Sequence, residues 1–131
     1  MKKCFILFSL LLVNVATLMA QDKYKTYCSL IGDENSLKKG IVNIRIDYGQ
    51  SDLKDNKFVD EKGEEIKFKT MVAAMNFMSK LGWELEQTYN RYDKIDGSPI
   101  IIWVLSKEIS SEEEITEGFQ TKYMFEKNNS R

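Results

Sequence analysis

The sequence predicts an α+β domain of two layers, an antiparallel sheet of about four main strands with one amphipathic helix packed on one face. Three observations predict it. Residues 41–48 alternate between apolar and polar side chains, as in a strand with one buried face. Residues 71–81 change to the helical period, with apolar side chains three and four positions apart. Residues 100–105 are apolar on both faces, which is typical of a central strand covered on both sides.

The remaining strands are expected around these three segments. Residues 24–31 are rich in aromatic and β-branched side chains and predict a first strand. A short hairpin is expected over residues 58–68, with Gly63 in its turn. Residues 83–89 alternate again and predict a further strand. One face of that strand would carry Trp83, Leu85, Gln87 and Tyr89. The predicted order is therefore two strands, a hairpin, a helix and two strands.

Both ends of the predicted helix carry sequence signals. Thr70 is a good N-cap candidate, because its hydroxyl can accept a hydrogen bond from a backbone N–H of the first turn. Gly82 stands where the end of a helix favours a left-handed residue. We expect Trp83 to plug the junction between helix and sheet. The methionines of the helix, Met71, Met75 and Met78, are expected in the core.

A C-terminal helical arm is expected over residues 110–131. Ser110 and Ser111 each precede a glutamate by three positions, which is the spacing of a capping box at a helix start. An apolar stripe would follow at Ile115, Phe119 and Tyr123. Gly118 interrupts this stretch. We expect a short helix that lies back on the sheet, with residues 127–131 disordered.

Residues 1–20 predict a secretory signal peptide. Two lysines precede an apolar run over residues 5–13, and the small Ala20 precedes a polar stretch. The run is shorter than the about 20 residues that span a bilayer, so a permanent anchor is disfavoured. We expect cleavage after Ala20, a periplasmic or secreted protein, one α+β domain over residues 21–109, and no stable membrane span after cleavage.

Composition excludes several classes of chemistry. Loss of Lys2 and Lys3 with the signal would take the formal net charge from −1 to −3, so no basic surplus would attract nucleic acid. The chain has no histidine, which removes Ser-His-Asp and Cys-His catalysis and the commonest zinc sites. Cys28 would be the only cysteine of the mature chain. We expect a buried, reduced thiol, the alternative being a disulfide with another chain. No cofactor or metal is expected.

Acidic residues offer only weak candidate sites. Glu84 and Glu86 would lie roughly 7 Å apart on one strand face. That separation occurs in inverting glycosidases, but two side chains of one strand do not flank a bond from opposite sides. A second acidic group lacks the order of a calcium loop. It consists of Asp52, Asp55, Asp60 and Glu61. A hydrolase is therefore the third functional hypothesis.

Four aromatic residues are the candidate ligand-binding positions. They are Trp83, Tyr89, Tyr92 and Trp103. Such side chains can stack on a sugar or a peptide, but core packing competes with this interpretation because Trp and Tyr bury large areas in small domains. Our leading hypothesis is a non-enzymatic interaction or accessory domain, with another protein of the cell envelope as its partner. The alternative is a small-ligand binding domain that uses these aromatics.

The sequence resembles two groups of bacterial proteins. Residues 81–85 (Leu-Gly-Trp-Glu-Leu) resemble the core of a motif in small bacterial domains of unknown function, Leu-Gly-x-x-Gly-Trp-Glu-Leu, although the x-x-Gly part is missing here. Most of the chain resembles short exported, uncharacterised proteins of Bacteroidetes. The shared features are the tyrosine-rich first strand, residues 47–50, residues 68–70 and the Gly-Trp-Glu corner. The resemblance implies export and a helix that ends before a strand pair, and it brings no activity, cofactor or catalytic residue.

Overall fold

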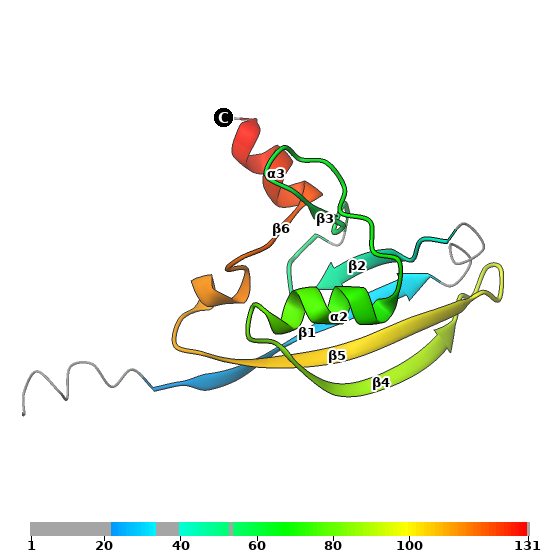
Figure 1. The fold of residues 1–131 in the computed structure, drawn as a ribbon, viewed down its shortest axis with the longest axis horizontal. Coiled ribbons are helices and arrows are strands. Elements are labelled where there is room, and N and C mark those ends of the chain that lie inside the picture. Colours follow the sequence, from blue (N-terminus) through cyan, green and yellow to red (C-terminus); the bar gives the residue numbers. More distant parts are fainter. Residues whose placement is uncertain (1–21, 34–39, 53, 131) are drawn as a thin grey trace, which may run out of the picture.

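The computed structural model describes residues 22–33, 40–52 and 54–130 (Figure 1). The predicted signal peptide lies outside these ranges. The elements are β1 (Tyr24–Asp33), β2 (Asn43–Asp47), β3 (Phe58–Val59), α2 (Met71–Ser79), β4 (Glu84–Tyr92), β5 (Pro99–Ile109), the 3-10 helix η2 (Glu112–Ile115), β6 (Gln120–Thr121) and α3 (Lys122–Asn129). The predicted class, α+β with a four-stranded antiparallel sheet, is confirmed.

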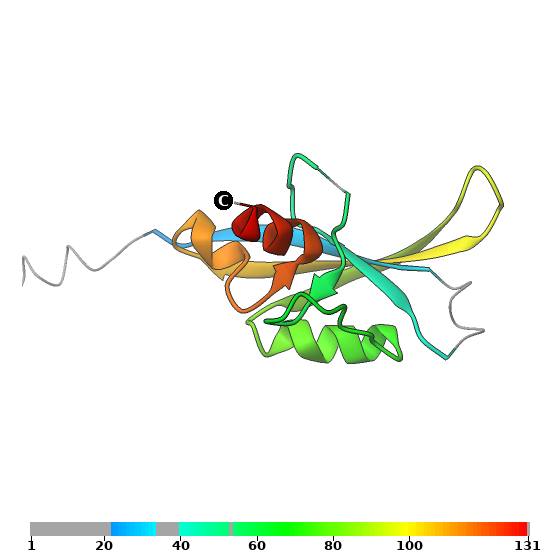
Figure 2. The ribbon, with the colours of Figure 1, turned by 90° about the horizontal axis from the view of Figure 1, so that it is seen from above.

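The main sheet has the strand order β2-β1-β5-β4, and all its pairs are antiparallel. The apolar strand β5 is central, as predicted, and pairs with β1 along the whole length of β1. Helix α2 lies along one face of the sheet (Figures 1 and 2). On that face Leu105 is fully buried, and on the other face Ile102 is buried as well. The second sheet is small and consists of β3 and β6.

Helix α2 and the sheet enclose the main core. Leu30, Ile46, Met78 and Leu105 are all inaccessible to solvent. A second part of the core joins the small sheet to α2 through phenylalanine rings. The ring of Phe58 lies edge-to-face against three others, with centroid distances of 5.7, 5.6 and 5.5 Å to Phe68, Phe77 and Phe119. Edge-to-face packing at this separation is favourable for aromatic rings.

The ends of α2 form as the sequence predicts. The Thr70 hydroxyl accepts a hydrogen bond from the Ala73 N–H at 3.0 Å. At the other end the Gly82 N–H donates to Ser79 O, and the Trp83 N–H donates to Met78 O. This pair of bonds is the Schellman motif, which needs a left-handed residue, and Gly82 has φ of +90°. The Trp83 side chain is 1% exposed and fills the junction between helix and sheet.

Strand β4 differs from the prediction. All nine of its residues are exposed, and the residues expected on one face point to both faces. The cause is a β-bulge, because Leu85 lies opposite Leu105 while Gln87 lies opposite Val104, which leaves Glu86 as an extra residue. The expectation that Leu85 and Gln87 share a face is therefore wrong. A bulge depends on pairing with a neighbouring strand, so the alternation of one strand does not show it.

The predicted C-terminal helical arm is present, with α3 as its helix, but its path differs from the prediction. A single helix through residues 115–123 does not form, because Gly118 has φ of +88°, outside the right-handed helical range. Its lack of a Cβ lets the Leu81 side chain pack against it. The chain instead forms η2, the short strand β6 and then α3, which begins at the N-cap Thr121. Helix α3 continues to Asn129, into the segment for which disorder was expected.

Variants at the Gly82–Trp83 corner test its structural role. Trp83→Ala should lower the free energy of unfolding by about 3–5 kcal/mol, because it removes a large buried aromatic side chain. Gly82→Ala should cost about 1 kcal/mol, since a Cβ is disfavoured at positive φ. The new Cβ would lie 3.4 Å from the flexible Lys107 side chain, so steric cost adds little. Urea unfolding measures both; a Trp83→Ala midpoint equal to that of the wild type would contradict this role.

Cys28 is 3% exposed, so the predicted burial of its thiol is confirmed. Burial, and after it the charge of Asp47, raises its pKa to about 12. An unfolded thiol ionises near about pH 8.5, so above that pH the unfolded state loses the proton and the folded state keeps it. Wild-type stability relative to Cys28→Ala should therefore fall as pH rises from 8.5 towards 10.5, by up to about 1.4 kcal/mol per pH unit. Urea unfolding of both proteins across this range checks it, and a constant difference would refute the assignment.

Candidate functional site

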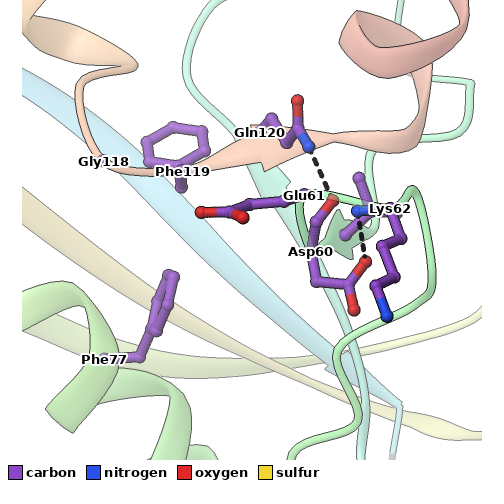
Figure 3. A pocket seen from close by; sticks show the side chains of 8 residues that line it. Asp60, Glu61, Lys62, Phe77, Gly118, Phe119 and Gln120 are labelled. Carbon is purple, nitrogen blue, oxygen red and sulfur yellow. Dashed lines mark hydrogen bonds between the residues drawn. The ribbon is translucent and has the colours of Figure 1, made fainter.

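A pocket of about 640 Å³ lies between the small sheet and α2 (Figure 3). It is lined by Val59, Asp60, Glu61, Lys62, Phe77, Gly118, Phe119 and Gln120. The rings of Phe77 and Phe119 form an apolar wall, and the Glu61 side chain reaches towards Phe119. None of the four aromatic residues predicted to bind a ligand lines this pocket.

Most of the polar groups around this pocket serve the turn after β3. One oxygen of the Asp60 carboxylate accepts hydrogen bonds from the N–H groups of Lys62 and Glu64, both at 2.9 Å. The Gln120 amide donates to the Asp60 carbonyl at 2.6 Å. Glu61 and Lys62 remain as exposed, opposite charges on the rim. The pocket thus offers an apolar wall and a mixed rim, without a nucleophile beside a general base.

A polar cluster on the main sheet joins three strands. The β-bulge brings the Glu86 carboxylate of β4 to Lys25 of β1, whose ammonium donates to Glu86 Oε1 at 2.7 Å. The hydroxyl of Ser106 on β5 donates to the same oxygen, and Ser106 is 2% exposed. Beside this cluster lies a second pocket of about 480 Å³. Glu86 therefore links β4 to β1 and β5 through these two hydrogen bonds.

The charge states in this cluster do not favour nucleophilic catalysis by Ser106. The hydrogen bond from Lys25, and after it that from Ser106, lowers the pKa of the Glu86 carboxyl. The hydrogen bond to Glu86 in turn raises the pKa of the Lys25 ammonium. Both groups are charged at neutral pH, so Lys25 has no free lone pair and Glu86 is a weak base. A serine hydroxyl needs a neighbouring base to become a nucleophile, and neither group is suited to that role.

The four aromatic candidates do not converge. Trp83 is in the core, and within the described ranges its indole N–H has no hydrogen-bond acceptor. Trp103 packs partly buried against the same core. Tyr89 and Tyr92 are 46% and 72% exposed on β4. Because Trp103 lies opposite Thr88 and Tyr89 lies opposite Ile102, the Trp103 and Tyr89 side chains project to opposite faces of the sheet.

The two edge strands of the main sheet, β2 and β4, differ in whether other segments cover their backbone groups. At the β2 edge, the N–H groups of Val42 and Ile46 donate to the carbonyls of Phe68 and Asn56, so following segments cover it. Strand β4 pairs only with β5, and it lies at the margin of the sheet with no described element beyond it (Figure 1). Sequence reasoning missed this edge. A signal was present, because a strand that carries Glu, Gln, Asn and Arg has the polar composition of natural edge strands.

The hydrogen bonds of Glu86 to Lys25 and Ser106 should make the stability of the fold depend on pH. The pKa of the Glu86 carboxyl is lower in the folded state than its value of about 4.3 in the unfolded state. The charged carboxylate therefore stabilises the fold at any pH above about 4.3. This stabilisation is lost as the pH falls from there through the pKa of the folded state. Glu86→Gln should therefore be less stable than the wild type at pH 7, with a difference that shrinks on acidification. Glu117→Gln is the matched control, because Glu117 is exposed and makes no salt bridge among the described residues. Urea unfolding between pH 3 and 7 tests this, and a pH-independent difference would contradict it.

No protein-family model matches the chain, and neither a curated protein nor a solved structure does. Over residues 22–33, 40–52 and 54–130, no helix is long and apolar enough to cross a membrane. In the same ranges no three acidic or cysteine side chains are grouped so that they could hold a metal ion.

Proposed function

We propose that this chain is an exported, non-enzymatic interaction domain of the cell envelope, and that it binds a protein partner by strand addition to β4. The observation that carries the proposal is the exposure of all nine residues of this edge strand. A strand added to a sheet edge gains main-chain hydrogen bonds for affinity and contacts of alternate side chains for specificity. Export is inferred from the signal-peptide pattern of residues 1–20.

The edge is of the kind that proteins ordinarily protect. An edge strand presents a row of unpaired N–H and C=O groups, and natural sheets hide it with proline, covering segments or very short strands, or blunt it with charges and β-bulges; β4 has only the last two of these devices. Strand β4 is long, contains no proline and has no covering segment among the described residues. It also exposes three large side chains, Leu85, Tyr89 and Tyr92. Exposed aromatic and aliphatic groups beside free backbone groups are typical of a binding edge.

The other hypotheses receive less support. A hydrolase would need a base for Ser106, and the neighbouring groups Lys25 and Glu86 are both charged. A ligand site built from the four aromatics would need them to converge, and they lie in the core and on opposite sheet faces. The pocket beside Phe77 has a wall on which a small molecule could lie, but its polar groups mostly hold the turn after β3.

Site-specific photo-crosslinking in the native envelope tests strand addition. A photoreactive residue at Gln87, on β4, should give discrete protein adducts. The same residue at Val72, which is 56% exposed on α2, is the matched control and should give few. Tyr89→Lys should diminish the Gln87 adducts, because a lysine on an edge opposes pairing. Equal labelling from Gln87 and Val72, or no discrete adduct from Gln87, would refute the proposal.

A further inference from the structure

We propose that the strand added to β4 is β4 of a second copy of this chain, in antiparallel orientation, so that two four-stranded sheets join into one. This inference rests on the proposed function and names its partner. Two identical edges that pair in antiparallel orientation are related by a two-fold axis perpendicular to the sheet. Such an interface is self-complementary, since each contact occurs twice.

The ladder positions of β4 are symmetric about Thr88. Thr88 lies opposite Trp103 of β5, Arg91 lies opposite Ile100, and Glu84 lies opposite Ser106. Arg91 and Glu84 are therefore both three ladder positions from Thr88, on either side of it. In the sequence Glu84 is four residues from Thr88, whereas Arg91 is three residues from it. The bulge takes Glu86 out of the ladder, so that both side chains lie three ladder positions from Thr88. If the two-fold axis passes through Thr88, Arg91 of one copy lies directly opposite Glu84 of the other.

The charges support this register. Arg91 and Glu84 have no salt-bridge partner within the described ranges, where the four ion pairs use other residues. Both side chains project to the sheet face opposite α2, because Ile100 and Ser106 alternate with Leu105. Opposite charges directly across neighbouring strands stabilise the pair, and like charges destabilise it. Parallel pairing would place Glu84 beside Glu84, so the charges favour the antiparallel arrangement.

The exposed apolar side chains fit the same register. Leu85 and Tyr92 lie opposite Leu105 and Pro99, so both project to the face that carries α2. Antiparallel pairing about Thr88 brings Tyr92 of one copy diagonally towards Leu85 of the other, within the reach of an aromatic side chain. On the opposite face, Tyr89 lies across from Gln87. At the axis Thr88 pairs with its own counterpart, which is a favourable cross-strand pair. Each face of the joint therefore has complementary partners.

Charge exchange tests the pairing in solution. The purified mature protein should form a dimer in sedimentation equilibrium. Glu84→Arg and Arg91→Glu should each weaken dimerisation about tenfold, because each creates two symmetry-related like-charge contacts. The double variant Glu84→Arg with Arg91→Glu should restore the wild-type Kd. Lys94→Glu, which makes the same charge change as Arg91→Glu but in the turn after β4, is the matched control and should leave the Kd unchanged. Urea unfolding of each variant shows that the fold is intact.

A cysteine on the axis tests the register. In Thr88→Cys the two Cα atoms would be about 4.5–5.5 Å apart across the joint, which suits a disulfide. Mild oxidation should therefore give a covalent dimer. Asn90→Cys, two residues along the same face, should not, because its counterpart lies too far away. The native Cys28 is buried and does not compete.

The outcomes separate this inference from the proposed function. A monomer at all concentrations, or a double variant as weak as either single one, would overturn the second copy as partner. If Gln87 adducts then appear in the envelope with a mass other than that of two chains, strand addition stands with a different partner. If neither a dimer nor Gln87 adducts are found, both proposals fail.

Discussion

Burial of Trp83 at the end of α2 is the interaction on which the remaining geometry depends. The Schellman bonds around Gly82 reverse the chain within two residues, and the indole then fills the space between helix and sheet. Because Trp83 is fixed, strand β4 must begin at Glu84, opposite Ser106. Together with the bulge, this starting point sets the ladder symmetry about Thr88. One local motif thereby sets the helix on the sheet and the register of its open edge.

The end of the C-terminal arm is held by the small sheet, whereas its first part contacts the main sheet, where Lys107 Nζ of β5 donates to Glu114 O. Strand β6 pairs with β3, and the N–H groups of Lys122 and Tyr123 donate to the carbonyls of Lys57 and Asp55. A Cβ at Gly63 would collide with the Phe125 ring, so the turn after β3 and helix α3 are closely packed. These contacts order a segment whose last residues were expected to be disordered because they lie at the terminus.

Local signals carried most of the fold prediction. The alternation over residues 41–48, the cap at Thr70 and the glycine at Gly82 each act within a few residues, so the sequence shows them directly. The bulge at Glu86 depends on pairing with a distant strand and was not predictable. The division of the arm and the exposure of β4 did have local signals, in Gly118 and in the polar composition of the strand. Of the predicted ligand positions, Tyr89 and Tyr92 do lie on the exposed edge, whereas Trp83 and Trp103 contribute to the core. A sequence gives aromatic content, but burial decides which rings are available.

The bulge in β4 allows an open sheet edge to be selective for the strand that it binds. An unprotected edge would accept many extended segments through backbone bonds alone, which favours aggregation. Charges at both ends of β4 oppose that, since an unmatched strand leaves Arg91 and Glu84 without partners or places like charges together. At the bulge, one acidic residue, Glu86, is bound within the chain by Lys25 and Ser106. Glu84 and Arg91 then lie at equal ladder distances on either side of Thr88. An antiparallel copy of the same strand can therefore form the Glu84–Arg91 ion pair twice.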